Sequence, residues 1–317
     1  MLTTRDLTVQ QLRCFVAVAE EQQFTAAADA LRIAQPSISS QIHRLEQVLG
    51  TPLFHRGHRP VLLTDAGLEL LPLARRVLSS LDDVVHGISE VDGLQRGHVT
   101  IGATPSLGAA LLPDVLASFH SKYPGVSLSF VERDSVVIAE QLEAGVLDLA
   151  LVVMPLRRPS LENTVLAIEK MVVVVAHDHP LASRTQITIL DLRNVPMIMF
   201  SEGYDIRAAT LAAFDRAGFA PTVALDGAEM GTVHAFVSAG LGAAIVPSIM
   251  ATSHDTLHML HLEAPILERT IGLVRPVHHS LSRAAAALSS EITTHLAEGG
   301  WPIRSAGELR FPDHKRS

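Results

Sequence analysis

The chain has 317 residues, of which 48% are hydrophobic and 18% are charged. This length can form two or three domains with cores of their own, and this composition excludes an intrinsically disordered protein. The formal net charge of −8 argues against non-specific wrapping of nucleic acid, although it leaves room for a local binding site. No run approaches the ~18 to 20 apolar residues of a membrane span, and the N-terminal segment lacks the apolar core of a signal peptide. We therefore expect a cytoplasmic protein without a membrane partner.

Three short helices are predicted near the N-terminus. Thr8 can cap the first and Thr25 can cap the second, over residues 26–31, because a threonine hydroxyl accepts an otherwise unpaired backbone N–H. Residues 32–35 form a turn, and Pro36 occupies the first position of the third helix, where its missing N–H costs nothing. The first helix would pack on the other two through Leu12, Phe15, Val16 and Ala19.

The third helix has one apolar and one polar face. Its apolar residues follow helical spacing from Ile38 through Ile42 and Leu45 to Leu49, and Gly50 supplies the expected stop. A helix with one buried face and a small polar outer face fits the major groove of DNA. A helical hairpin in any small bundle is the alternative interpretation. The polar face carries Ser37, Ser40, Gln41 and Arg44.

Two short strands, 53–55 and 61–63, are predicted next, and they flank a hairpin tip that carries Arg56 and Arg59. These arginines can reach phosphates or a minor groove, the alternative being a solvated turn. Because the charges of the first 65 residues balance, Arg44 would need to cluster with both to attract phosphate. Three helices and a hairpin of this kind predict a winged helix-turn-helix over residues 1–64.

A long helix is predicted from Asp65 to about Val91, with Thr64 as its cap. Its apolar residues alternate steps of four and three, which is typical of a seam between two helices. The seam could lie within one chain, but a dimerisation helix is favoured because the stripe is narrow and follows a DNA-binding head. Pro72 should kink this helix or loosen its first turns. Residues 65–97 are thus a linker and dimerisation helix with a hinge, and the predicted seam residues are Leu70, Ala74, Val77, Leu81, Val84 and Ile88.

From His98 onward, strands alternate with helices in two successive units. This order predicts the α/β fold class, with mostly parallel sheets and helices on both faces. Two such lobes with a cleft between them suggest a small-molecule binding module. We expect an effector-binding domain at 98–300, a first lobe at about 98–163 and 270–300, a second lobe at about 164–269, and a poorly ordered tail at 301–317.

Other chemistries have weaker support. The single cysteine, Cys14, excludes a disulfide framework and a paired-thiol switch. No Gly-x-Ser-x-Gly elbow or phosphate loop supports an enzyme. A metal- or pH-sensing regulator, an architectural DNA-binding protein and a solute-binding protein remain alternatives, but we expect no catalytic residue, metal or cofactor. The histidines behind the metal alternative are His177, His179, His254, His258, His261, His278 and His279.

The chain resembles the LysR-type bacterial transcriptional regulators along nearly its whole length. The resemblance rests on FTAAADAL at 24–31, AQPSISSQIHRLE at 34–46, LTDAG at 63–67 and HPLA at 179–182. It implies sequence-specific binding to promoter DNA, and a homodimer or a tetramer built as a dimer of dimers. It also implies a small-molecule co-inducer between lobes that resemble periplasmic binding proteins, with RNA polymerase as a further candidate partner.

The resemblance also assigns roles to residues of the head. Gln35, Pro36, Ser37 and Ser40 would face bases, while Ser39, Arg56 and Arg59 would touch the DNA backbone or minor groove. Many relatives carry arginine where Ser40 stands, a residue that can read guanine with two hydrogen bonds. The base preference therefore stays open, although the family suggests an interrupted, AT-containing palindrome. Thr25, Gln41 and Arg44 complete the expected DNA-binding set.

Effector contacts are expected in both lobes. Ser106 and Ser135 open helices, where exposed N–H groups favour an anion, and helix capping is their alternative role. Relatives that bind dicarboxylates often carry arginine at the position of Val153, so a less anionic or more apolar ligand is expected here. The expected effector-binding residues are Thr104, Ser106, Ser135, Val153, Ser201, Met230 and Thr232.

Overall fold

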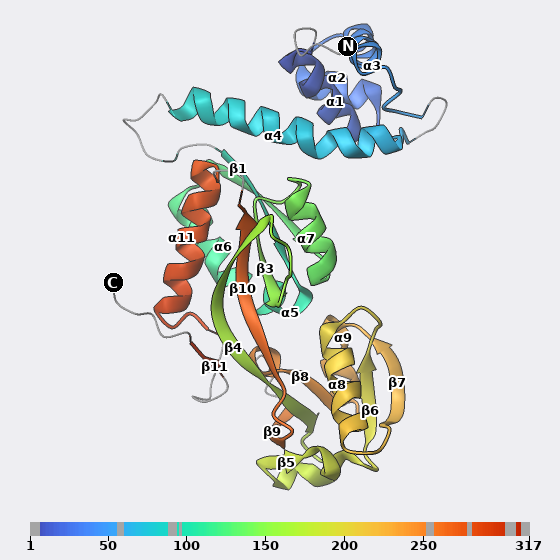
Figure 1. Ribbon diagram of the computed structural model, residues 1–317, viewed down its shortest axis with the longest axis vertical. Helices are drawn as coiled ribbons and strands as arrows, with labels where there is room; N and C mark the ends of the chain where they lie inside the picture. The colour runs from blue at the N-terminus through green and yellow to red at the C-terminus, as the bar shows by residue number, and fades with distance from the viewer. Residues whose placement is uncertain are drawn as a thin grey trace.

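The computed structural model describes residues 7–55, 60–87, 94, 97–251, 257–277, 281–301 and 309–311. Side chains at 72, 76, 79, 80 and 82–87 are not described. Arg56, Arg59 and Ile88, the side chain of Val84 and most of the tail therefore lie outside the described residues. Figure 1 shows the head, the long helix α4, the first lobe and the second lobe following one another along the longest axis.

Three helices form the head: α1 (Val9–Glu21), α2 (Phe24–Leu31) and α3 (Gln35–Leu49). Thr8 caps α1 as predicted, in a reciprocal arrangement with Gln11. The predicted apolar face of α3 is confirmed, and Gly50 ends this helix at a φ of 70°. The core between the helices contains Leu12, Cys14, Phe15, Val18, Ala27, Ala28, Ile38, Ile42 and Leu45.

Two predicted helix starts in the head are wrong by one or more residues. Helix α2 begins at Phe24 and its N-cap is Gln23, so Thr25 lies inside the helix and does not cap it. Phe24 packs against Phe54 with ring centroids 5.9 Å apart, and this contact favours the earlier start. Helix α3 begins at Gln35, so Pro36 is its second residue. This position is still in the first turn, where backbone N–H groups have no partner within the helix, so the N–H that proline lacks is not needed.

The expected hairpin strands are reduced to one isolated antiparallel bridge in the described residues, between Phe54 and Leu63. The backbone N–H of His55 also donates to the carbonyl of Leu62 at 2.9 Å. Helix α4 (Asp65–Gly87) follows, and Thr64 caps it as predicted by accepting from the N–H of Gly67 at 3.1 Å.

The predicted seam residues of α4 lie in two different environments. Ala74 is only 1% exposed, and together with Leu70 it packs into the core of the head of the same chain. Ala74 therefore faces the head of its own chain, where α4 lies along α1 and forms the Arg75–Glu20 ion pair at 2.9 Å, while Leu70 stays partly exposed. Val77, in contrast, is 45% exposed.

The body contains one sheet that runs through both lobes, in the order β2-β1-β3-β10-β4-β9-β5. It is mixed rather than mostly parallel, because β10 and the long β4 pair antiparallel to each other. Its strands are β1 (Gly97–Ala103), β2 (Val126–Glu132), β3 (Leu149–Met154), β4 (Leu161–Ala176), β5 (Gln186–Thr188), β8 (Ala244–Pro247), β9 (Leu257–Ala264), β10 (Glu268–Pro276) and β11 (Leu309–Arg310).

The first lobe is a sheet with helices on both faces. Helix α7 (Ser135–Glu143) covers one face, and α6 (Leu112–Lys122) with α11 (Arg283–Ala297) covers the other, as Figure 1 shows. A short helix, α5 (Pro105–Ala110), links β1 to α6. Part of the tail is ordered, contrary to prediction, because β11 pairs with β4 and Arg310 bonds to Glu268 at 2.6 Å.

The second lobe is built on the second half of β4 and on β9. A two-stranded parallel sheet, β6 with β7, stands beside them. The lobes are joined within β4, whose first half pairs with β10 and whose second half pairs with β8 and β9. The remaining elements are β6 (Pro196–Phe200), β7 (Thr222–Ala228), α8 (Asp205–Arg216), α9 (Met230–Ser238), α10 (Ser248–Ala251) and the short 3-10 helices Pro180–Ser183 and Ile189–Leu192. Among the described helices, none is both long and apolar enough to cross a membrane.

Candidate functional site

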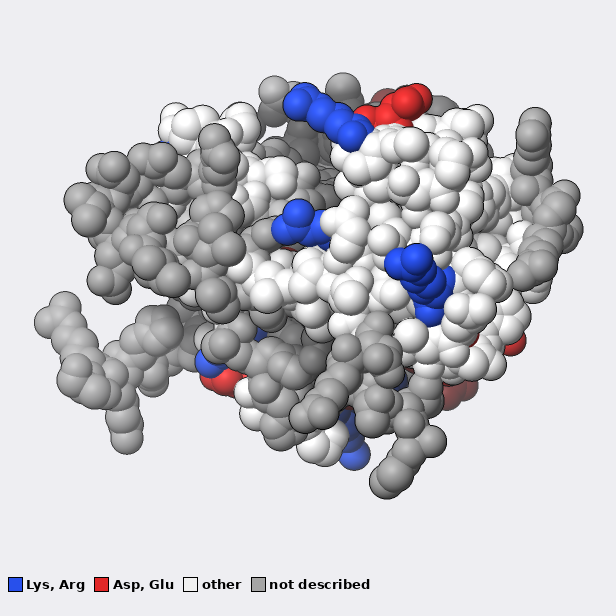
Figure 2. Space-filling view, turned by 90° about the horizontal axis from the view of Figure 1, so that it is seen from above, with Lys and Arg blue, Asp and Glu red and all other residues white. Residues whose placement is uncertain are grey.

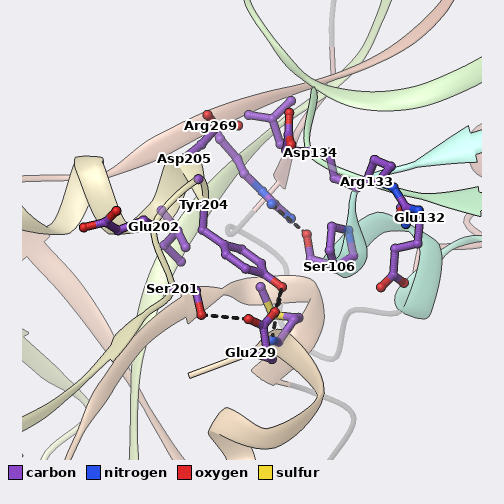
Figure 3. A pocket seen from close by; sticks show the side chains of 16 residues that line it. Ser106, Glu132, Arg133, Asp134, Ser201, Glu202, Tyr204, Asp205, Glu229 and Arg269 are labelled. Carbon is purple, nitrogen blue, oxygen red and sulfur yellow. Dashed lines mark hydrogen bonds between the residues drawn. The ribbon is translucent and has the colours of Figure 1, made fainter. Parts of the chain in front are cut away.

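A cavity of about 320 Å³ lies between the two lobes (Figure 3). It opens where β1, β2 and β3 of the first lobe end, opposite the first turns of α8 and α9. Five of the seven residues predicted to contact an effector line it, and Ser135 and Thr232 do not. The lining is Thr104, Pro105, Ser106, Glu132, Arg133, Asp134, Val153 and Arg269 from the first lobe, with Ser201, Glu202, Gly203, Tyr204, Asp205, Ile206, Glu229 and Met230 from the second.

The expected capping alternatives for the two serines are wrong. Thr104 is the N-cap of α5, and Ser106 instead bonds to the Arg269 guanidinium. Helix α7 is capped by Asp134, which accepts from two backbone N–H groups. Ser135 sits behind this cap, where its hydroxyl accepts from the N–H of Val153 at 3.3 Å. Thr232 is exposed on α9 and donates to the Glu229 carbonyl of its own helix at 3.1 Å.

A buried ion pair crosses the junction of the lobes. Arg269 on β10 faces Glu169 on β4, and its Nε donates to the Glu169 carboxylate at 2.6 Å. Its Nη1 donates to the Ser106 hydroxyl at 2.8 Å. The second oxygen of Glu169, which is 0% exposed, accepts from the Ser248 hydroxyl at 3.1 Å and the Ile249 N–H at 2.8 Å. Charges buried in this way persist only when paired and hydrogen-bonded.

Arg269 was missed by the sequence reasoning. The available signal was a pair of opposite charges, Glu169 and Arg269, each placed at the start of an apolar strand segment. Spacing alone could not pair them, because the two residues are 100 positions apart and only the β4–β10 register aligns them.

The second lobe contributes a hydrogen-bonded carboxylate. Glu229 accepts from the hydroxyls of Ser201 and Tyr204, both at 2.7 Å, as the dashed lines in Figure 3 show. These two bonds hold the pKa of Glu229 below its usual value, with Tyr204 as the larger cause. Burial, reinforced by the bond to Glu229, raises the pKa of Tyr204 to about 12. Glu229 is therefore ionised and firmly oriented at neutral pH.

Asp205, in the first turn of α8, behaves differently. Partial burial raises its pKa, and the negative charge of Asp134 across the cavity adds to the rise. The Arg269 charge and a hydrogen bond from Ser135 oppose it. Asp134 and Asp205 therefore form a pair of like charges contributed by different lobes, and the Arg269 charge compensates them in part.

The head presents its predicted DNA-binding residues on one side of α3. Gln35, Pro36, Ser37, Ser40 and Arg44 are exposed, and Ser39 and Gln41 are partly exposed. Gln35 donates to the Ser39 hydroxyl at 3.3 Å. Figure 2, a view from above, shows separate basic side chains on a largely uncharged surface. Attraction of phosphate is thus spread over isolated arginines of the described residues, such as Arg44, instead of a continuous basic patch.

The histidine clusters of the sequence do not assemble a metal site in the described residues, where no group of three or more potential ligands occurs. His177 packs beside His258 with ring centroids 6.5 Å apart, and His258 bonds to the Arg184 carbonyl at 2.9 Å. His179 accepts from the N–H of Leu181, and burial lowers its pKa. His254, His278 and His279 lie outside the described residues.

A helix-turn-helix head joined by a long helix to a two-lobed body with a cleft is the architecture of a ligand-responsive transcription regulator. Comparison with protein-family models agrees with this class: residues 9–68 match the bacterial regulatory helix-turn-helix protein, lysR family, and residues 92–297 match the LysR substrate binding domain. The chain therefore belongs to the LysR family, and it is a DNA-binding transcriptional regulator with an effector-binding domain.

Individual relatives span nearly the whole chain. The HTH-type transcriptional regulator YybE of Bacillus subtilis is 32% identical, over 91% of this chain and 99% of the relative. A full-length OxyR variant from Pseudomonas aeruginosa is similar in structure, with a TM-score of 0.73 and 25% identity over 90% of this chain and 94% of that one. Full-length CbnR complexed with its target DNA shares the fold, with a TM-score of 0.67 and 23% identity over 92% and 99% of the two chains.

Proposed function

We propose that the cavity between the lobes is the effector site, and that a small molecule bound there shifts the lobes and re-angles paired DNA-binding heads on a promoter. The supporting observation is that the cavity is lined from both lobes, and that β4 runs from one lobe into the other. A ligand that contacts two movable parts can favour one arrangement over another through the contacts that differ between them. The cavity's location therefore suits a control site.

DNA contact is assigned to the exposed polar side of α3. Gln35, Pro36, Ser37 and Ser40 would face bases in the major groove, while Ser39 and Arg44 would be near the backbone. Arg56 and Arg59 would reach phosphate or the minor groove from the hairpin. Because serine at position 40 is short, readout at that position would depend on a single hydrogen bond or on water.

Self-association is assigned to the side of α4 that faces away from α1. Leu68, Leu73 and Val77 are 59%, 48% and 45% exposed, which is unusual for large apolar residues on one helix. The exposed part of the predicted seam would thus run through Leu73, Val77 and Leu81 toward Val84 and Ile88. A homodimer, or a tetramer built from two dimers, would pair two or four heads on a symmetric DNA site.

The signal would be a diffusible small molecule, with no resident cofactor or metal and no catalytic role. Cys14 is the single cysteine and is 0% exposed inside the head, so an intrachain disulfide cannot form. This separates the chain from any relative that senses oxidants through a pair of thiols. As a DNA-binding regulator of transcription, the protein would act in the cytoplasm, with RNA polymerase as a further partner.

The test of this function is a mobility-shift experiment with the full-length protein. We expect specific binding to the DNA fragment upstream of its own gene, with an affinity for unrelated DNA of the same length that is lower by about 10³-fold, the low end of the usual range for specific recognition. The two substitutions Gln35→Ala and Ser37→Ala together should abolish this difference. Equal affinity for both fragments would contradict the proposal.

A further inference from the structure

The cavity between the lobes is rich in negative charge. Five carboxylates line it, from Glu132, Asp134, Glu202, Asp205 and Glu229, against the guanidinium groups of Arg133 and Arg269. In Figure 3, Glu202 points away from the other labelled side chains, and the remaining four carboxylates stay around the cavity. A cleft with this excess of one charge favours a positively charged ligand over an anion.

The two guanidinium groups do little to reduce this excess. The charge of Arg269 is already matched by the buried Glu169 carboxylate, 2.6 Å away. Arg133 is exposed and donates to the backbone carbonyl of Glu132 at the rim. Asp134 and Asp205 line the cavity from opposite lobes. The Arg269 charge offsets only part of their effect, because burial and the Asp134 charge together still raise the pKa of Asp205.

A second observation points to a hydrogen-bonding group on the ligand. Thr104 lines the cavity and is only 6% exposed, and its hydroxyl oxygen is buried at the cavity wall. This hydroxyl has no hydrogen-bond partner within the part of the chain that the structure describes, and the same holds for Nη2 of Arg269. Buried polar groups in native proteins are almost always satisfied, so these two atoms are open to a hydrogen-bonding group that enters the cavity.

Building on the effector site proposed above, we infer that its ligand is a small organic cation with a hydrogen-bond acceptor at its other end. An ammonium or guanidinium nitrogen would lie between Asp134 and Asp205, and the acceptor would face Thr104 and Arg269. The cation would remove the repulsion between carboxylates of opposite lobes, so binding and approach of the lobes would favour each other. An amino acid or an aminated carboxylic acid has both ends, and a dicarboxylate lacks the first.

The experiment compares end groups at constant chain length. Thermal unfolding of the full-length protein is measured with 1,4-diaminobutane, 4-aminobutanoate, succinate and 1,4-butanediol, and with the matching six-carbon set. We expect stabilisation by compounds that carry an ammonium group, strongest for the amino acids, and none by the diacids or diols. Isothermal titration with the best compound should show binding weaker by about tenfold or more in Asp205→Asn and in Asp134→Asn.

The control is Asp215→Asn, which removes an exposed carboxylate from the same helix as Asp205 but outside the cavity. This variant should bind like the parent protein, and Thr104→Val should weaken the amino acid more than the diamine. Stabilisation by succinate, binding that survives the Asp134→Asn/Asp205→Asn double substitution, or no response to any ammonium compound would each overturn the inference. Specific DNA binding is measured separately, so its failure would count against the proposed function instead.

Discussion

Arg269 and Glu169 lie opposite each other on β10 and β4, and the bond of 2.6 Å between them is the ion pair at the junction of the lobes. The side chains are 11% and 0% exposed, so water contributes little to either charge. Through Ser106, Ser248 and Ile249 the same pair reaches α5 on one side and α10 on the other. Arg269 also lines the cavity, which makes it a direct physical link between a ligand and the strands that join the lobes.

Glu169→Gln should lower the free energy of unfolding by about 3–5 kcal/mol, because it leaves the buried Arg269 charge without its partner. The neighbouring exposed pair, Glu268 with Arg310, supplies the control, and Glu268→Gln should cost less than about 1 kcal/mol. Urea unfolding followed by circular dichroism measures both. A loss at Glu169 as small as the loss at Glu268 would refute the structural importance of the buried pair.

Ala74→Asp and Val77→Asp should have different effects, although they lie one turn apart on α4. Ala74 is buried in the head, so a carboxylate at this position should unfold the head. The free energy of unfolding should fall by several kcal/mol, roughly the cost of burying an unpaired polar group or more. Val77→Asp should leave the head folded but reduce self-association, since Val77 is exposed. Circular dichroism and light scattering distinguish the two outcomes. An unchanged molar mass for Val77→Asp would remove this residue from the proposed seam.

Gln35→Ala should weaken binding to the upstream DNA fragment by about 1–3 kcal/mol if Gln35 reads a base edge. Arg56→Ala should instead weaken binding to all sequences and reduce the salt dependence by about one ion, as loss of a phosphate contact does. Gln47→Ala, on the exposed end of α3, is the control and should bind normally. Full affinity in both test variants would argue against docking through this face.

The stability of the body should respond to pH through Asp205. Its pKa is raised in the folded state, mainly by partial burial, so the folded protein holds this proton more tightly than the unfolded chain does. The stabilisation from protonated Asp205 is therefore present at low pH and lost as pH rises through the raised pKa. Asp205→Asn should flatten this part of the profile, measured by urea unfolding from mildly acidic to neutral pH. An identical profile in the variant would show that Asp205 does not titrate in this range.

Glu229 affects the pH dependence of stability in the opposite direction from Asp205. Its pKa is lowered by the hydroxyls of Tyr204 and Ser201, so its stabilisation is present above the ordinary glutamate pKa and lost as pH falls toward the lowered value. Tyr204→Phe should reduce the acid sensitivity that Glu229 confers, because it removes the larger of the two causes. The same series of urea curves tests this, and a steeper loss of stability in acid would contradict it.

Short sequence patterns were sufficient to predict many helix ends and buried helix faces of this protein. Thr8, Gly50 and Thr64 mark helix ends because caps act over three or four residues, and Ile38, Ile42 and Leu45 show their buried face through helical spacing alone. The family resemblance then placed five of the expected effector contacts around one cavity. The heptad spacing of α4 could not show which seam residues are buried in the head and which are exposed, because the same spacing suits a partner helix and the chain's own α1.

The charge of the cleft depends on contacts between distant segments. Val153 predicts a less anionic or more apolar ligand, but Arg269 enters the same cavity from a strand more than a hundred residues later. Asp134 and Asp205 belong to different lobes, and their repulsion exists only when the lobes face each other. Helix and strand patterns record which side of an element is buried, whereas electrostatic coupling follows distance in space, so folding alone brings these charges together.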